Sequence, residues 1–221
     1  MFIGHYAVGF AAKKVRPEIS LGTFFLAAQW ADIVWPVLVL TGVERVEIRP
    51  GATAANPFVF VHYPWSHSLA ALAVWGALFA LAHRAVRRTT LPASVLLGAV
   101  VVSHWVLDFA THVPDMPIGP SGPFVGLGLW RSLPATVAVE IALFAAGVAL
   151  YLSATRAVDR MGSAGLAALA AFLILVYFGS LAAPPPPSVR AIGWGTLATI
   201  LFPVWGYWVD RHRESRTRLE R

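Results

Sequence analysis

The sequence contains no cysteine among its 221 residues. Without thiols the chain can form no disulfides and offers no thiolate ligands, so any metal ion must be bound through nitrogen and oxygen atoms. Charged residues are also scarce: they make up 13% of the chain, whereas a soluble domain carries roughly 25%. This deficit is too large for a soluble protein of this size. The apolar start has no basic segment before it, so we do not expect a cleaved signal peptide.

Hydrophobic residues account for 57% of the sequence and gather in long runs such as 135–154. A helix of about 20 apolar residues crosses a hydrocarbon core of about 30 Å, and backbone groups in lipid must be satisfied within the helix. The sequence therefore predicts an all-α, polytopic transmembrane helix bundle. We expect six full spans, preceded by a short N-terminal membrane-inserted helix at 2–12; the six are 19–42, 67–84, 92–110, 134–155, 163–182 and 190–209.

The net charge of +6 comes from basic residues at the ends of the apolar runs, without the aromatic interleaving typical of nucleic-acid binding. If the side that carries Lys13 is cytoplasmic, 13 basic residues lie inside and four lie outside. Such a bias predicts a cell-membrane (inner or plasma membrane) protein with both ends of the spanning region in the cytoplasm and no nucleic-acid partner. The four outside residues are Arg45, Arg49, Arg131 and Arg190.

We treat residues 1–221 as one transmembrane domain with three parts. Residues 1–115 form a half that carries a metal site, 134–209 form three further spans, and 210–221 form a basic cytoplasmic tail. The segments 43–66 and 111–133 then lie on the outer side and are rich in Pro and Gly. Functional sites tend to be built from such loops, so we expect the site near the outer face.

Several acidic residues and histidines lie in or beside the apolar runs, where they are costly and usually mark function. They are His5, Asp32, His62, His67, His104, Asp108, His112, Asp115 and Glu140. With a rise of about 1.5 Å per residue, Asp32 lies about 20 Å and Asp108 about 24 Å above the cytoplasmic ends of their spans. Different helices therefore bring these groups to one layer, and His5, about 12 Å up, is the poorest fit.

Spacing strengthens the metal-site interpretation. His104 and Asp108 lie one turn apart on a single helical face, which His112 would extend. In the segment 62–68, His62 lies in the loop and His67 opens a helix that Ser66 is placed to cap. We predict as metal ligands His5, Asp32, His62, His67, His104, Asp108 and His112. Asp115 and Glu140 are predicted catalytic bases, with a role in orienting the ligands as the alternative.

These residues resemble the motifs of a known family, the YdjM-type (LexA-binding, inner-membrane-associated) metal-dependent hydrolases. That family has an early His, matched by His5, then an Asp-containing segment, matched by Asp32. Its His-Arg-Gly-x-Thr-His-Ser motif is matched by the segment 62–68, and its Ser-His-x-x-x-Asp helix by 103–108. The chain departs from the pattern where the family has a second Asp and a His after Asp32, and where it has Arg-Gly-x-Thr after His62. The resemblance implies a metal-dependent hydrolase.

Nitrogen and oxygen ligands suit Zn²⁺, our choice, or Mn²⁺ and Fe²⁺ where carboxylates dominate. We therefore predict a zinc-dependent hydrolase of a lipid or phosphoester at the outer interface, with the bilayer as its surroundings. One alternative is a proton or cation transport protein, in which the same groups would form a relay across the membrane. Another is a metal-binding membrane scaffold without turnover, and polar packing between helices is the simplest interpretation of any single residue.

Overall fold

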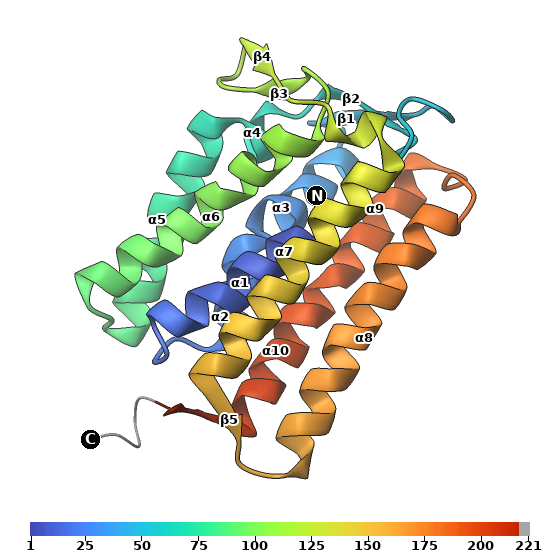
Figure 1. Cartoon of the computed structure of the whole chain (residues 1–221). Coiled ribbons are helices and arrows are strands. Elements are labelled where there is room, and N and C mark those ends of the chain that lie inside the picture. Colours follow the sequence, from blue (N-terminus) through green and yellow to red (C-terminus); the bar gives the residue numbers. More distant parts are fainter. Residues whose placement is uncertain (217–221) are drawn as a thin grey trace.

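The computed structural model of the chain describes residues 1–216, which fold into a helix bundle with short strands at its two ends (Figure 1). The α-helices are α1 (Ile3–Val15), α2 (Leu21–Ala28), α3 (Trp30–Leu40), α4 (Pro64–His67), α5 (Leu69–Arg87), α6 (Leu91–Thr111), α7 (Leu133–Ala154), α8 (Arg160–Ala182), α9 (Val189–Leu197) and α10 (Leu201–Arg211). Two 3₁₀ helices are η1 (Leu129–Arg131) and η2 (Ala198–Ile200). The prediction of an all-α fold is confirmed.

The strands form three antiparallel pairs. They are β1 (Arg45–Ile48) with β2 (Phe58–His62), β3 (Met116–Pro117) with β4 (Phe124–Val125), and β5 (Thr155–Ala157) with β6 (Arg213–Ser215). The first two pairs order the two long loops that the sequence analysis placed on the outer side. The third pair ties the start of the basic tail to the end of α7. The rest of that tail, 217–221, lies outside the described residues.

Among the described residues, four helices are long and apolar enough to cross a membrane: α5, α6, α7 and α8. Helices α2 and α3 make a fifth candidate if they are taken together as one span bent by 50°. The membrane character expected from the composition is thus supported, but the predicted count of six full spans is not.

The two spans that the sequence overcounted are both interrupted. The predicted span 19–42 breaks at Gln29, whose φ of −99° and ψ of 9° leave the helical region. The predicted span 190–209 divides at η2, because Pro203 has no N–H to donate to the carbonyl of Thr199. Hydropathy alone does not reveal such breaks, since most residues around them are apolar and the averaged hydropathy of each segment stays high.

Helix α1 lies in the middle of the bundle, where α7 crosses in front of it (Figure 1). It packs along α7 and also contacts α2 and α6. The approach to α7 is close: a Cβ atom on Gly147 would lie 2.5 Å from the carbonyl oxygen of Ala7. A helix of 13 residues is too short to span a bilayer, and here it does not have to, because protein surrounds it.

The apolar core has three centres: one around Phe10, one between α2 and α6, and one around Trp35 that reaches the β1–β2 pair. Phe10 of α1 packs edge-on against Phe25, Phe144 and Tyr151, which join α1 to α2 and α7. The second centre packs α2 against α6. The predicted halves 1–115 and 134–209 therefore share one core, since α1 of the first half packs chiefly among helices of the second.

The two ends of the bundle differ in charge. The pairs β1–β2 and β3–β4 and helix α4 lie at one end, while the connections from α1 to α2, α5 to α6 and α7 to α8 lie at the other (Figure 1). These connections carry the basic clusters that the sequence analysis grouped together. Lys13 is an exception within its cluster, because it is only 5% exposed and bonds Asp210.

Candidate metal centre

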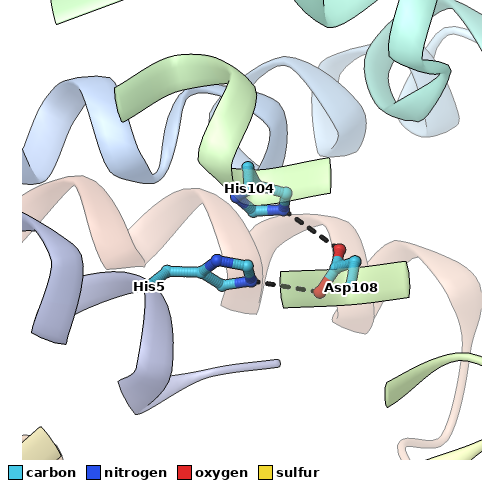
Figure 2. A group of neighbouring side chains, drawn as sticks. All are labelled: His5, His104 and Asp108. Carbon is cyan, nitrogen blue, oxygen red and sulfur yellow. Dashed lines mark hydrogen bonds and ion pairs between the residues drawn. The ribbon is translucent and has the colours of Figure 1, made fainter. Parts of the chain in front are cut away.

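Asp108 lies at the centre of a cluster of histidines drawn from separate helices. On α6, Nε2 of His104 lies 3.2 Å from Oδ2 of Asp108, as the predicted spacing of one turn requires. From α1, Nε2 of His5 lies 3.1 Å from Oδ1 of the same carboxylate. Figure 2 shows the two imidazoles meeting Asp108 from different helices, and their rings are stacked with centroids 3.7 Å apart. His5, the poorest fit in the sequence analysis, is one of the closest groups.

Three further predicted ligands complete the cluster. Nε2 of His67, at the end of α4, lies 3.5 Å from Oδ1 of Asp32 and 3.9 Å from Oδ2 of Asp108. Nε2 of His112, just after α6, also lies 3.9 Å from Oδ2 of Asp108. Two groups of three residues have ligand atoms within 4.8 Å of one another: His5, His104 and Asp108, and Asp32, His67 and His104. A buried His/Asp cluster that could hold a metal ion is therefore present.

Burial makes this cluster costly without a cation. His5, His104 and Asp108 are each at most 3% exposed. An unpaired charge or an unsatisfied polar atom in such a setting is strongly unfavourable, and such groups are retained where they bind or react. Asp32 differs from the others, because its side chain is 26% exposed and faces a cavity.

The hydrogen bonds of His104 fix which of its nitrogens carries the proton. Its Nδ1 lies 2.8 Å from the carbonyl oxygen of Ala28, which can only accept, so Nδ1 carries the hydrogen. The lone pair of Nε2 then points toward the carboxylates of Asp108 and Asp32, and Nε2 has no hydrogen-bond partner among the described residues. Facing acceptors repel one another unless a cation lies between them, so the donor set fits a metal ion.

His67 is oriented in the same way through a residue that the sequence analysis missed. Glu44 is 1% exposed and accepts hydrogen bonds from the backbone N–H groups of Trp65 and Ser66 and from the Ser66 hydroxyl. Because that hydroxyl donates its one hydrogen to Glu44, its oxygen accepts from Nδ1 of His67, 2.7 Å away. Nε2 of His67 is thereby left with a lone pair directed at Asp32.

No sequence signal identified Glu44. It precedes Arg45, Glu47 and Arg49, so its segment reads as a solvated, charged loop. Ser66, which the sequence analysis assigned to helix capping, has this linking role instead. The capping serine is Ser68, whose side chain accepts a hydrogen bond from the N–H of Ala71 at the start of α5.

His112 is held by Asp115, a predicted catalytic base. Nδ1 of His112 lies 2.9 Å from Oδ1 of Asp115, and the Tyr63 hydroxyl donates to the same oxygen at 3.2 Å. Burial, and then the charge of Asp115, raise the pKa of the Tyr63 phenol, which therefore stays a donor. Three imidazoles thus have Nδ1 bound to an acceptor and Nε2 directed at the carboxylates, the arrangement typical of metal-ligating histidines.

Glu140, the other predicted base, lies beside the start of α1. Its two oxygens accept hydrogen bonds from the backbone N–H groups of Phe2 and Gly4 at 2.9–3.1 Å. A carboxylate at a helix N-terminus satisfies free N–H groups and complements the helix dipole. Glu140 therefore positions the helix that carries His5. The amino group of Met1 also contacts the cluster, 2.5 Å from Oδ1 of Asp108.

One predicted ligand is not part of this arrangement. His62 lies in β2 opposite Arg45, and its side chain makes no hydrogen bond or ion pair with residues 1–216. Because it ends a strand, with Tyr63 between it and α4, it is directed by the β1–β2 pairing and not by the helix that carries His67. The structure groups the other five predicted ligands, His5, Asp32, His67, His104 and His112, around Asp108.

A cavity of about 550 Å³ adjoins the cluster. Asp32, His67, Asp108 and His112 line one part of it, and other parts are lined by the 50–58 loop and by α8 and α9. Comparisons with protein-family models, curated proteins and solved structures found no match for the chain. The description of the site therefore rests on its own geometry.

Proposed function

We propose that this chain is a membrane-embedded, metal-dependent hydrolase that acts on a lipid or phosphoester substrate at the outer interface. The observation that carries the proposal is the set of imidazole lone pairs directed at the buried carboxylates of Asp108 and Asp32, next to a cavity. Oδ1 of Asp108 has partners in the Met1 amino group and His5. A purely structural network would also place donors against Oδ2 of Asp108 and against Asp32, whereas there the lone pairs of His104 and His67 face carboxylate oxygens. The resemblance to the YdjM-type hydrolases over 1–115 points to the same chemistry.

The residues that would hold an ion form two groups that share His104: one adds His5 and Asp108, and the other adds Asp32 and His67. His112 lies at the flank. Imidazole and carboxylate donors in this number suit Zn²⁺, and also Mn²⁺ or Fe²⁺. When bound, such an ion supplies Lewis-acid polarisation of a substrate oxygen and makes water more acidic.

Asp32 has two roles in this proposal: one oxygen of its carboxylate would bind the ion, and the other would accept a proton. Asp115 is bonded to His112 and Tyr63, and Glu140 is bonded to backbone N–H groups, so both of the predicted bases are occupied. Asp32 combines partial exposure with a position in the cavity wall, so it can orient a water molecule and take its proton. Asp115 and Glu140 then act by positioning His112 and His5.

The membrane placement follows the charge distribution. With the basic end of the bundle in the cytoplasm of an inner or plasma membrane, the metal centre lies near the outer interface. A substrate whose head group lies at that depth would reach the cavity without crossing the bilayer.

A proton or cation relay is the less favoured function because aromatic residues separate the polar groups. On α1, Phe10 lies between His5 and Lys13, and on α7, Phe144 lies between Glu140 and Tyr151. Phe10 and Phe144 pack against each other with ring centroids 5.9 Å apart. This packed layer leaves no chain of titratable groups between the two ends along these helices.

Elemental analysis of the purified full-length protein tests the proposal. We expect about one or two equivalents of a divalent transition metal in the parent and none in His104→Ala or Asp108→Ala. The matched control is His62→Ala, which removes a histidine outside the cluster and should keep the metal. Hydrolysis of lipid esters and phosphoesters should be lost together with the metal.

A metal-free parent that no divalent ion restores would refute the proposal. Equal metal content in the parent and in Asp108→Ala would refute the assignment of the site. A metal-replete parent inactive on every lipid ester and phosphoester would favour the scaffold alternative.

A further inference from the structure

The cavity beside the metal centre carries buried polar atoms that none of residues 1–216 satisfies. Oε1 of Gln29, Nε1 of Trp35 and the hydroxyl of Tyr177 have no hydrogen-bond partner among the described residues, and all three side chains line the cavity. They are 1%, 4% and 2% exposed, respectively. Unsatisfied buried polar atoms are rare in native proteins, and three of them around one cavity indicate a polar ligand.

The three atoms are chemically neutral and complementary in hydrogen bonding. The Trp35 indole can only donate, the free oxygen of Gln29 can only accept, and the Tyr177 hydroxyl can do both. Hydroxyl groups of a ligand both donate and accept, so a polyol or amide head group would satisfy all three. Thr196 and Thr199 add further hydroxyls to the same lining.

The charge of the lining argues against an anionic head group. Among the described residues that line the cavity, Asp32, Asp108 and Glu140 are acidic and none is lysine or arginine. The Met1 amino group also belongs to the lining, but it is already paired with Asp108. Arg131, from the facing loop, is not part of the lining. Phosphate groups in proteins are bound mainly by arginine, lysine and helix N-termini, so a phosphate head would meet carboxylates without a cationic side chain.

Another part of the lining is apolar and suits an acyl chain. Phe58, Phe60 and Trp130 lie on the outer side of the cavity, and Leu181 lies near the end of α8. Trp35 also connects this lining to the metal centre, because its ring lies 6.4 Å from that of His67. The neutral polar groups, the apolar lining and the metal ligands therefore surround one space.

We propose that the cavity binds an uncharged amphiphile, an acyl ester of a hydroxyl-bearing head group, and that the site hydrolyses its carboxylic ester. In the reaction the oxygen of water bonds to the acyl carbon, the ester C–O bond breaks, and the alcohol leaves with a proton from the water. The products are a fatty acid and a neutral polyol. This inference rests on the proposed hydrolase function, and it narrows the substrate from lipids and phosphoesters to neutral esters.

Two probes that differ only in the phosphate test the inference: 1-monooleoylglycerol and 1-oleoyl lysophosphatidate. Native mass spectrometry of the full chain in detergent reports lipid binding and metal content together. We expect the metal-loaded parent to bind monooleoylglycerol at least about tenfold more tightly than lysophosphatidate, the factor that about 1.4 kcal/mol represents. Water should convert the bound monooleoylglycerol to oleate and glycerol.

Tyr177→Phe removes one hydroxyl that has no partner in the free protein, so the fold should be retained. This variant should weaken monooleoylglycerol binding by about three- to tenfold, the loss expected for one neutral hydrogen bond, with the metal content unchanged. The matched control is Tyr207→Phe, because the Tyr207 hydroxyl bonds Thr23 and lies outside the cavity. It should leave lipid binding unchanged.

Equal or tighter binding of lysophosphatidate would overturn the inference, as would equal effects of Tyr177→Phe and Tyr207→Phe. The two proposals fail differently. A parent without metal or turnover that still prefers monooleoylglycerol, and loses that preference in Tyr177→Phe, would reject the hydrolase and support the neutral head-group site. A metal-loaded parent that binds and cleaves the phosphate lipid better would support a hydrolase and reject the neutral head group.

Discussion

Helix α1 carries a buried polar group at each end, and the two groups are built on different rules. At the basic end, Nζ of Lys13 lies 2.6 Å from Asp210 and 2.9 Å from the carbonyl oxygen of Ile19, and Tyr151 also donates to Asp210. Each donor there meets an acceptor. At the other end, His5 belongs to the Asp108 cluster, where imidazole lone pairs face carboxylates. The first group is paired throughout. In the second, the Met1 amino group and His5 contact only Oδ1 of Asp108, and the Nε2 atoms of His67 and His104 still face carboxylate oxygens.

Breaking the ion pair between Lys13 and Asp210 should have the largest effect on stability. Asp210→Leu leaves the Lys13 ammonium buried without its counter-charge, and we expect a loss of about 3–5 kcal/mol in the free energy of unfolding. Metal content should be unchanged in the folded fraction. Denaturant unfolding in detergent measures the loss. The double variant Lys13→Met/Asp210→Leu should recover most of it, and a double variant as unstable as the single would contradict the ion-pair interpretation.

A change at Glu44, which orients His67 through Ser66, should alter metal affinity more than the free energy of unfolding. In Glu44→Gln, the side-chain NH₂ can donate to Ser66, whose hydroxyl then donates to His67 and moves the imidazole proton to Nε2. Losing an outer hydrogen-bond partner of a metal ligand typically costs about 10- to 100-fold in affinity, and we expect a loss in that range from chelator competition.

The control for Glu44→Gln is Glu47→Gln, because Glu47 is exposed and pairs only with Arg49. In Glu44→Gln the hydrogen bond between Ser66 and His67 would reverse its direction. Adding Ser66→Ala removes that hydrogen bond, so the double variant should bind metal no worse than Glu44→Gln alone. Additive losses from the two changes would show that Glu44 acts by holding the loop and not through the His67 proton.

Helix α1 can also be displaced as a whole, which should disturb both groups. In Gly147→Ala the new Cβ would lie 2.5 Å from the Ala7 carbonyl oxygen, and we expect a loss of about 1–3 kcal/mol in unfolding free energy. The control is Gly179→Ala on α8, where no atom lies within 4 Å of the added Cβ. That change should stabilise the protein by up to about 1 kcal/mol through helix propensity. Equal effects at the two positions would contradict close packing of α1 on α7.

The smallest effect on stability is expected at Asp159, on the surface near the basic end of the bundle. The hydrogen bond from His212, and then the N–H of Gly162, hold the pKa of Asp159 below its ordinary value of 3.8. A carboxyl whose pKa is lower in the folded state stabilises the fold above its ordinary pKa, and this contribution is lost as the pH falls through the lowered value. Thermal unfolding between pH 5 and pH 3 should show a slightly smaller loss of stability in Asp159→Asn. An identical pH profile would contradict the prediction.

Composition and spacing were sufficient for part of the fold and the site. The lack of charge and the apolar runs predicted helices, because lipid leaves a backbone no other partner. The spacing of His104 and Asp108 predicted their shared face, because residues four apart meet on any α-helix. The span count was wrong, since the breaks at Gln29 and at η2 depend on backbone angles and on a single proline that hydropathy does not register.

The sequence by itself determined a cysteine-free chain of helices, several of them long and apolar enough to cross a membrane, because these properties follow from residue type and helical periodicity. Tertiary structure alone decided which of its histidines and acidic residues meet. It buried α1 so that His5 reaches Asp108, placed His62 in a strand instead of the cluster, and assigned Glu140 to the start of α1. It also turned Glu44 inward to set the proton of His67. These outcomes depend on contacts between segments far apart in the chain, and no local pattern encodes such contacts.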